Sequence, residues 1–119
     1  MDDDALAVVR EFWRIQDSGD YTRLVPLFAD DAILEDPVYG TFHGREAVAA
    51  FMAKMVGEMQ ARKTRFRAVE IAGAGDVGWA QWVAETPSGE VHGVEIYRTR
   101  SGKLTYYRDY LNAPVGKAR

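Results

Sequence analysis

The sequence contains no cysteine and only two histidines among its 119 residues. Without cysteine, the chain has no disulfide, no thiolate nucleophile and no sulfur ligand for a metal. His43 and His92 lie far apart and fit no recognised metal-ligand spacing, so we expect neither a metal nor a cofactor. The 18 aspartates and glutamates are therefore the groups on which chemistry in this chain must depend.

Other features are also missing. No apolar run approaches the roughly 18 residues of a membrane span, and no signal-like segment precedes the first helical pattern. The formal net charge of -3 argues against an electrostatic surface for nucleic acid. No nucleophile elbow, phosphate-binding loop or dinucleotide fingerprint occurs. We expect a cytoplasmic protein that binds neither nucleic acid nor membrane.

The hydrophobic pattern changes from helical to alternating near the middle of the chain. Helical spacing predicts helices over residues 4–18, 21–28 and 44–59. Alternation and turn residues predict strands over residues 32–35, 63–72, 77–85, 91–100 and 104–111. This order favours a single α+β domain over residues 1–119, with helices on one face of a curved, mostly antiparallel sheet.

Three carboxylates stand out on the predicted strands. Asp36 ends a short strand directly before Pro37, where it could cap a turn or point into a pocket. Glu95 and Asp109 share strand faces with the aromatic residues Tyr97 and Tyr107. Each could be a surface carboxylate paired with arginine, or a buried group with a raised pKa that transfers protons.

Two segments resemble known families. The stretch VVREFWRIQDSGDYTRLVPLFADDAILEDPVYG resembles the start of the bacterial ketosteroid isomerases. The closing GKLTYYRDYLN resembles the last strand of limonene-epoxide hydrolases and SnoaL-like polyketide cyclases. All belong to the nuclear transport factor 2-like superfamily. The resemblance implies a cone-shaped fold in which three helices and a curved sheet enclose a deep pocket, with a homodimer formed through the sheet face.

The isomerase resemblance implies roles for three positions. Asp36, in EDPV, falls at the general base, and Glu95 falls where that family keeps a protonated aspartate as an oxyanion donor. Phe12 stands where the family has a tyrosine donor. Because phenylalanine cannot donate a hydrogen bond, this departure counts against steroid isomerase activity itself.

The hydrolase and cyclase resemblance centres on Asp109. It matches one of the two catalytic aspartates of the hydrolases, whose neighbouring arginine and second aspartate correspond to Gln81 and Val83. It also matches the single pocket aspartate of the SnoaL-like cyclases.

Aromatic and aliphatic residues are expected to line the pocket and contact a hydrophobic ligand. Strand parity allows only one of Trp79 and Trp82 to face inward. The full set expected around the ligand, with the catalytic Asp36, Glu95 and Asp109, is Phe12, Trp13, Phe51, Met55, Trp79, Gln81, Val83, Tyr97 and Tyr107.

Three functions remain open. The first is carboxylate-mediated proton transfer, an isomerisation or cyclisation, on a hydrophobic carbonyl compound. The second is epoxide opening with Asp109 as the acid. The third is a non-catalytic ligand-binding or dimeric assembly domain.

Overall fold

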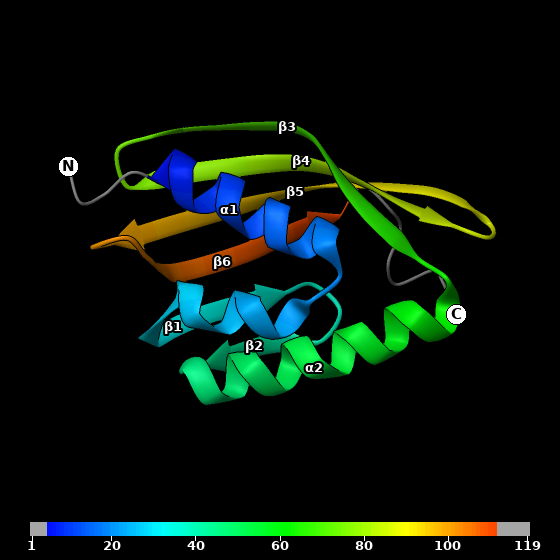
Figure 1. The fold of residues 1–119 in the computed structure, drawn as a ribbon, viewed down its shortest axis with the longest axis horizontal. Coiled ribbons are helices and arrows are strands. Elements are labelled where there is room, and N and C mark those ends of the chain that lie inside the picture. The colour runs from blue at the N-terminus through cyan, green and yellow to red at the C-terminus, as the bar shows by residue number, and fades with distance from the viewer. Residues whose placement is uncertain (1–4, 112–119) are drawn as a thin grey trace.

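A computed structural model describes residues 5–111 (Figure 1). Residues 1–4 and 112–119 of the expected single domain lie outside this range. In chain order the elements are α1 (Ala5–Ser18), the 3-10 helix η1 (Tyr21–Leu27), β1 (Phe28–Asp36), β2 (Gly40–His43), α2 (Arg45–Arg62), β3 (Arg65–Ala74), β4 (Val77–Thr86), β5 (Gly89–Arg100) and β6 (Lys103–Leu111).

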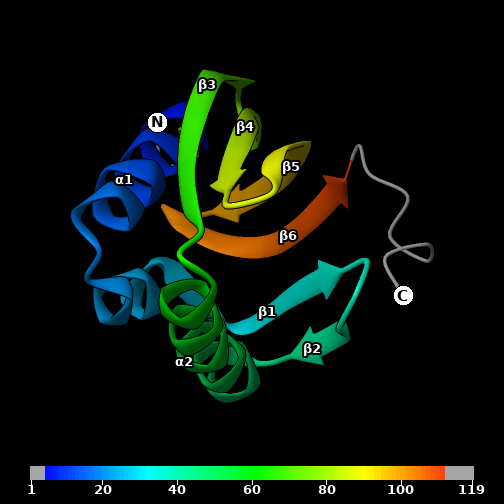
Figure 2. The same cartoon turned by 90° about the vertical axis from the view of Figure 1, so that its right-hand side faces the viewer.

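The six strands form one sheet in the order β2-β1-β6-β5-β4-β3. All neighbours are antiparallel except β1 and β6, which run parallel. Figure 2 shows the sheet curving so that both long helices lie on the same side of it. Helix α1 contacts β3, β4 and β5, whereas α2 contacts β1, β2 and η1. This arrangement confirms the predicted α+β fold with a curved, mostly antiparallel sheet and three helices.

Backbone conformation explains where the helices end. Lys63 adopts a left-handed conformation with φ 53° and its N–H caps the end of α2, so the helix continues to Arg62 and β3 starts at Arg65. The sequence had predicted a helix end at residue 59 and a strand from residue 63. The segment containing Pro26 forms a 3-10 helix that ends at Leu27, because Phe28 already belongs to β1.

Strand β2 was not predicted. It has only four residues and pairs with β1 from Ile33↔His43 to Asp36↔Gly40. So short a strand shows too little alternation to be recognised in the sequence.

The core lies between the helices and the concave face of the sheet. Its centre is Phe12, which is fully buried and whose ring contacts the rings of Trp13, Phe28, Tyr97 and Tyr107. In the described part of the chain, neither α1 nor α2 has the length and apolar character that a membrane crossing requires.

Candidate active site

A cavity of about 220 Å³ opens between α2, the β1–β2 turn and the concave face of the sheet. We call it the carboxylate cavity, because Asp36 and Asp109 both line it. Most of its wall is apolar, from Met55 and Met59 on α2 to Phe66, Trp82 and Val91 on the strands. The remaining lining residues are Val38, Tyr39, Glu58, Arg62, Thr64, Ala84, Thr86 and Leu111.

Asp109 is placed in the cavity by strand alternation on β6. Its outward-pointing neighbour Arg108 forms an ion pair with Glu35 at 2.8 Å on the other face of the sheet, and so does not neutralise Asp109. Instead the indole Nε1–H of Trp82 donates a hydrogen bond of 3.0 Å to Asp109 Oδ1. Trp82 is itself held by stacking on Phe66, at a centroid distance of 5.2 Å and an interplanar angle of 12°. The hydrogen bond from the stacked Trp82 indole therefore fixes the orientation of the Asp109 carboxyl group.

Burial raises the pKa of Asp109 from 3.8 to about 7. The hydrogen bond from Trp82 acts in the opposite direction and limits this rise in pKa, while the negative charge of Asp36 adds to it. Near neutral pH the carboxyl group is therefore present in both protonation states, which suits a group that gives and takes protons.

Asp36 combines the two roles that the sequence left open. Its Oδ1 accepts hydrogen bonds from the backbone N–H groups of Val38 (2.8 Å) and Tyr39 (3.0 Å), as in an aspartate-capped turn. The same residue lines the carboxylate cavity together with Asp109. The turn thus holds one carboxylate oxygen and presents the side chain to the cavity.

Glu95 lies behind the cavity wall and is only 2% exposed. It pairs directly with Asp109 in the β5–β6 register, so the two side chains lie on the same face of the sheet. The hydroxyl groups of Tyr97 and Tyr107 donate one hydrogen bond to each of its carboxylate oxygens. Trp13 Nε1–H donates in turn to the Tyr97 hydroxyl at 2.8 Å. Glu95 therefore belongs to a buried polar network and is not one of the cavity-lining residues.

The network is electrostatically coupled to the cavity. Burial raises the pKa of Glu95 well above its ordinary value, and the charges of Asp109 and Asp36 raise it further. The two tyrosine hydroxyls oppose this effect, because they stabilise the ionised carboxylate. Burial and the neighbouring carboxylates also raise the pKa values of Tyr97 and Tyr107. Three carboxylates thus interact across one small region of the concave face.

The structure places several expected pocket residues elsewhere. Trp79 and Gln81 lie on the outer face of β4, and Trp79 is 42% exposed there. Of the two tryptophans of this strand, Trp82 is the one whose side chain points inward. Val83 is buried but does not line the carboxylate cavity. These placements correct the expectation that Trp79, Gln81 and Val83 contact a ligand in the pocket.

Most of the other expected residues are buried in the core and do not line the carboxylate cavity. Phe12 packs in the aromatic core, and Phe51 stacks on Phe42 at a centroid distance of 4.5 Å. Trp13, Tyr97 and Tyr107 are buried members of the Glu95 network, and none of them lines the cavity. Of the expected set of ligand contacts, Met55 lines the cavity directly.

Sequence reasoning missed several lining residues. Tyr39 follows Asp36 in EDPVY, and its hydroxyl donates a hydrogen bond of 2.7 Å to Glu58 on α2. Helical spacing could have identified Glu58 and Arg62, which lie one and two turns after Met55 on the same side of the helix. Within residues 5–111, no three His, Asp or Glu side chains gather closely enough to hold a metal ion.

Comparisons with known proteins agree with this architecture. The structure is similar to that of a nuclear transport factor 2-like protein of unknown function from Mesorhizobium loti, with a TM-score of 0.80, 24% identity and 95% of each chain covered. It is also similar to a computationally designed 17-OHP binder, with a TM-score of 0.73, 27% identity, and coverage of 93% of this chain and 95% of that one.

A third similar structure is a protein from Kribbella flavida, with a TM-score of 0.78, 18% identity, and coverage of 95% of this chain and 90% of that one. No curated protein matches the sequence. The family model of the SnoaL-like domain matches residues 9–107, from within α1 to within β6. The chain therefore belongs to the SnoaL-like domain family of the nuclear transport factor 2-like superfamily.

Proposed function

We propose that this protein is an acid–base enzyme that moves a proton within a small, hydrophobic, carbonyl-containing substrate. The observation that carries this proposal is the Asp109 carboxyl group: it is largely buried, it faces an apolar cavity that Asp36 also lines, and its pKa is about 7. A group with a pKa near the working pH is the most effective general acid or base. Membership of the SnoaL-like family is consistent with this class of reaction.

Asp109 supplies the acid. In its protonated form it donates a hydrogen bond to the substrate carbonyl oxygen and stabilises the negative charge that develops there. The Trp82 N–H holds its other oxygen, so the proton is directed into the cavity. Phe12 cannot donate a hydrogen bond to the substrate, and in the proposed reaction the carboxylic acid of Asp109 on β6 donates it instead.

Asp36 supplies the base. The turn N–H groups of Val38 and Tyr39 occupy Oδ1, which leaves Oδ2 to accept a proton from the carbon next to the carbonyl group. Return of that proton to a different carbon gives an isomerisation. If the resulting enolate instead attacks a second carbonyl of the same molecule, a C–C bond forms, the C=O π bond opens to an alkoxide, and the alkoxide takes the proton from Asp36, which gives a cyclisation.

The dimensions of the cavity restrict the substrate. Its volume of about 220 Å³ lies below the range of about 300–1,000 Å³ that drug-sized ligands occupy. Its apolar wall favours a compact hydrocarbon skeleton, and Arg62 at the rim offers one cationic contact.

The direct test is an activity assay with a small β,γ-unsaturated ketone and a small epoxide. We expect turnover of the ketone, and a loss of about 10²–10⁴-fold in kcat for Asp36→Asn and for Asp109→Asn. Glu35→Gln is the matched control, because Glu35 is the sequence neighbour of Asp36 but contacts Tyr106 and Arg108 on the outer face. Activity that is unchanged in both aspartate variants would contradict the proposal. Turnover of the epoxide alone, lost in Asp109→Asn, would favour the epoxide-opening alternative.

A second candidate function is ligand binding without catalysis. The designed 17-OHP binder, at 27% identity and a TM-score of 0.73, supports it, because that protein has a similar structure and was designed to bind a small molecule. Ligand binding that persists in Asp36→Asn and Asp109→Asn, with no turnover in the wild type, would favour this reading.

We also propose that the protein forms a homodimer through the outer face of the sheet. Trp79 and Tyr110 are 42% and 49% exposed there, and the half-buried Val94 and Ile96 belong to the same face. A two-fold axis through this face would bury them against the second copy. Sedimentation analysis should show a dimer that Trp79→Lys dissociates, and a wild-type monomer would refute it.

A further inference from the structure

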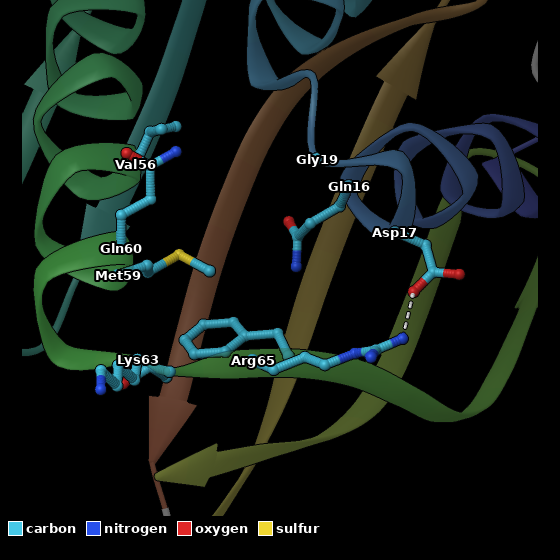
Figure 3. Close-up of a pocket in the computed structure, with 10 residues that line it drawn as sticks. Gln16, Asp17, Gly19, Val56, Met59, Gln60, Lys63 and Arg65 are labelled. Atoms are coloured by element: carbon cyan, nitrogen blue, oxygen red, sulfur yellow. Dashed lines mark ion pairs between the residues drawn. The ribbon is translucent and has the colours of Figure 1, made fainter. Parts of the chain in front are cut away.

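A second hollow, of about 260 Å³, lies beside the carboxylate cavity, between the C-terminal ends of α1 and α2 and the start of β3 (Figure 3). Three residues line both spaces and form the wall between them: Met59, Thr64 and Phe66. Each space alone is smaller than the roughly 300–1,000 Å³ of a typical ligand site, whereas the two joined would fall within that range. The wall therefore decides how large a molecule the carboxylate cavity can hold.

The wall forms where the chain passes from α2 into β3. Lys63 adopts a left-handed conformation with φ 53°, which ends the helix. The backbone N–H of Thr64 then donates a hydrogen bond of 3.0 Å to the carbonyl oxygen of Met59. This bond holds Thr64 against the last turn of α2, and Phe66 follows at the start of β3. Local backbone structure thus keeps the three wall residues together.

The three wall residues differ in what depends on them. Phe66 stacks on Trp82 at a centroid distance of 5.2 Å, and Trp82 donates a hydrogen bond to Asp109. A change at Phe66 would therefore also disturb the proposed acid. Thr64 has a short side chain, whereas Figure 3 shows the long Met59 side chain extending from α2 into the hollow. Met59 is the wall residue whose side chain closes the carboxylate cavity on this side.

We propose that Met59 is the specificity-determining residue that sets the size limit of the ligand, because it keeps the alkyl chain of a ketone out of the second hollow. The substrate class is accordingly a compact ketone with a short chain. That the ligand is a ketone rests on the proposed function, whereas the size limit follows from the wall. A longer chain has to remain at the mouth of the cavity in contact with water, where it adds little to the affinity.

The test is a titration of the intact protein with acetophenone and with hexanophenone, which carries a longer alkyl chain on the same aryl ketone. The wild type should bind the two with similar affinity. Met59→Ala joins the two spaces, so burial of about two of the added methylene groups should raise the affinity for hexanophenone about tenfold and leave that for acetophenone unchanged. Met59→Val, a milder truncation, should give a smaller gain in the same direction.

Three further variants show whether the gain comes from the wall. Met55→Ala is the matched control, because Met55 lies one turn earlier on α2 and lines the carboxylate cavity but not the second hollow. In this variant the two ketones should keep similar affinities. Met59→Leu keeps the volume of the side chain and should bind like the wild type. Val56 lines only the second hollow, so adding Val56→Trp to Met59→Ala should refill that space and cancel the gain.

The chemical shifts of backbone amides locate the longer chain. Asp17 and Gly19 line the second hollow but not the carboxylate cavity, and the reverse holds for Val91 and Leu111. Hexanophenone should therefore shift the signals of Val91 and Leu111 in the wild type. In Met59→Ala it should shift those of Asp17 and Gly19 as well.

Any of three results would overturn the proposal: an unchanged ratio of the two affinities in Met59→Ala, an equal gain in Met55→Ala, or shifts at Asp17 and Gly19 when hexanophenone binds the wild type. If neither ketone binds the wild type or Met59→Ala, the size limit and the ketone substrate both fail. None of these measurements depends on turnover. If the ketones bind as expected but activity is unchanged in Asp36→Asn and Asp109→Asn, the proposed reaction fails and the size limit set by Met59 stands.

Discussion

Replacing Asp109 with asparagine should change how the stability of the protein depends on pH. In the folded protein the pKa of this carboxyl group is about 7, compared with 3.8 for the free group. Between these two values the unfolded chain has lost the proton while the folded protein keeps it. Unfolding then releases a proton, so the free energy of unfolding falls as pH rises from about 4 to about 7 and is constant above that range.

The size of the effect follows from the shift. One pKa unit corresponds to about 1.36 kcal/mol, so a rise of roughly three units destabilises the folded state by about 4 kcal/mol at pH 8 relative to pH 4. Because the charge of Asp109 also raises the pKa of Glu95, the measured quantity belongs to the pair of carboxyl groups. Asparagine keeps the shape of the side chain and removes this titration.

Urea unfolding of the wild type and Asp109→Asn at pH steps from 4.5 to 9 measures the difference. We expect the stability of the variant relative to the wild type to increase by several kcal/mol between pH 4.5 and about 7, and to stay constant above that. Asp31→Asn is the control without a pH slope. The hydrogen bond from Arg100 lowers the pKa of Asp31 below its ordinary value of 3.8, so the stabilisation it gives is lost only below that pH and should be constant from pH 4.5 to 9. If the difference in the free energy of unfolding between the wild type and Asp109→Asn stays constant from pH 4.5 to 9, Asp109 is not a buried carboxyl group that exchanges a proton in this range.

Three further changes test the site and its support. Trp82→Phe keeps a ring against Phe66 but removes the N–H group that lowers the pKa of Asp109. NMR of the carboxyl group should therefore show a pKa of Asp109 above its wild-type value. An unchanged pKa would argue against the hydrogen bond. Gly93→Ala should lower the free energy of unfolding by about 1–3 kcal/mol, because the new Cβ would lie 2.3 Å from Trp82 Cζ2. By contrast, Gly57→Ala on α2, where nothing lies within 4 Å, should raise it by about 0.5–1 kcal/mol in the same urea assay.

Much of the fold follows from periodicity and turn chemistry. The alternation of Gly93, Glu95 and Tyr97 placed them on one face of β5, and the structure buries all three. Irregular backbone accounts for the differences. The register between β5 and β6 shifts between Arg98 and Thr99, and the left-handed conformation of Lys63 moves the junction between α2 and β3. Strand alternation with a period of two residues predicts neither of these irregularities.

The polar organisation of the site was harder to predict than its location. Parity and family resemblance brought Asp36 and Asp109 to one cavity, but they could not show that Trp82 would donate to Asp109. That contact joins residues 27 positions apart and depends on the orientation of an indole ring.

The Glu95 network also explains why Asp109, and not Glu95, is the acid in the proposed reaction. The hydroxyls of Tyr97 and Tyr107 engage both oxygens of Glu95, and its side chain has almost no exposure from which to reach a substrate. An acid in that position can act only through its neighbour. Because Glu95 and Asp109 are paired across β5 and β6, ionising one makes ionising the other more costly. The buried network therefore favours retention of one proton between the two groups, and the member that faces the cavity is the one able to deliver it.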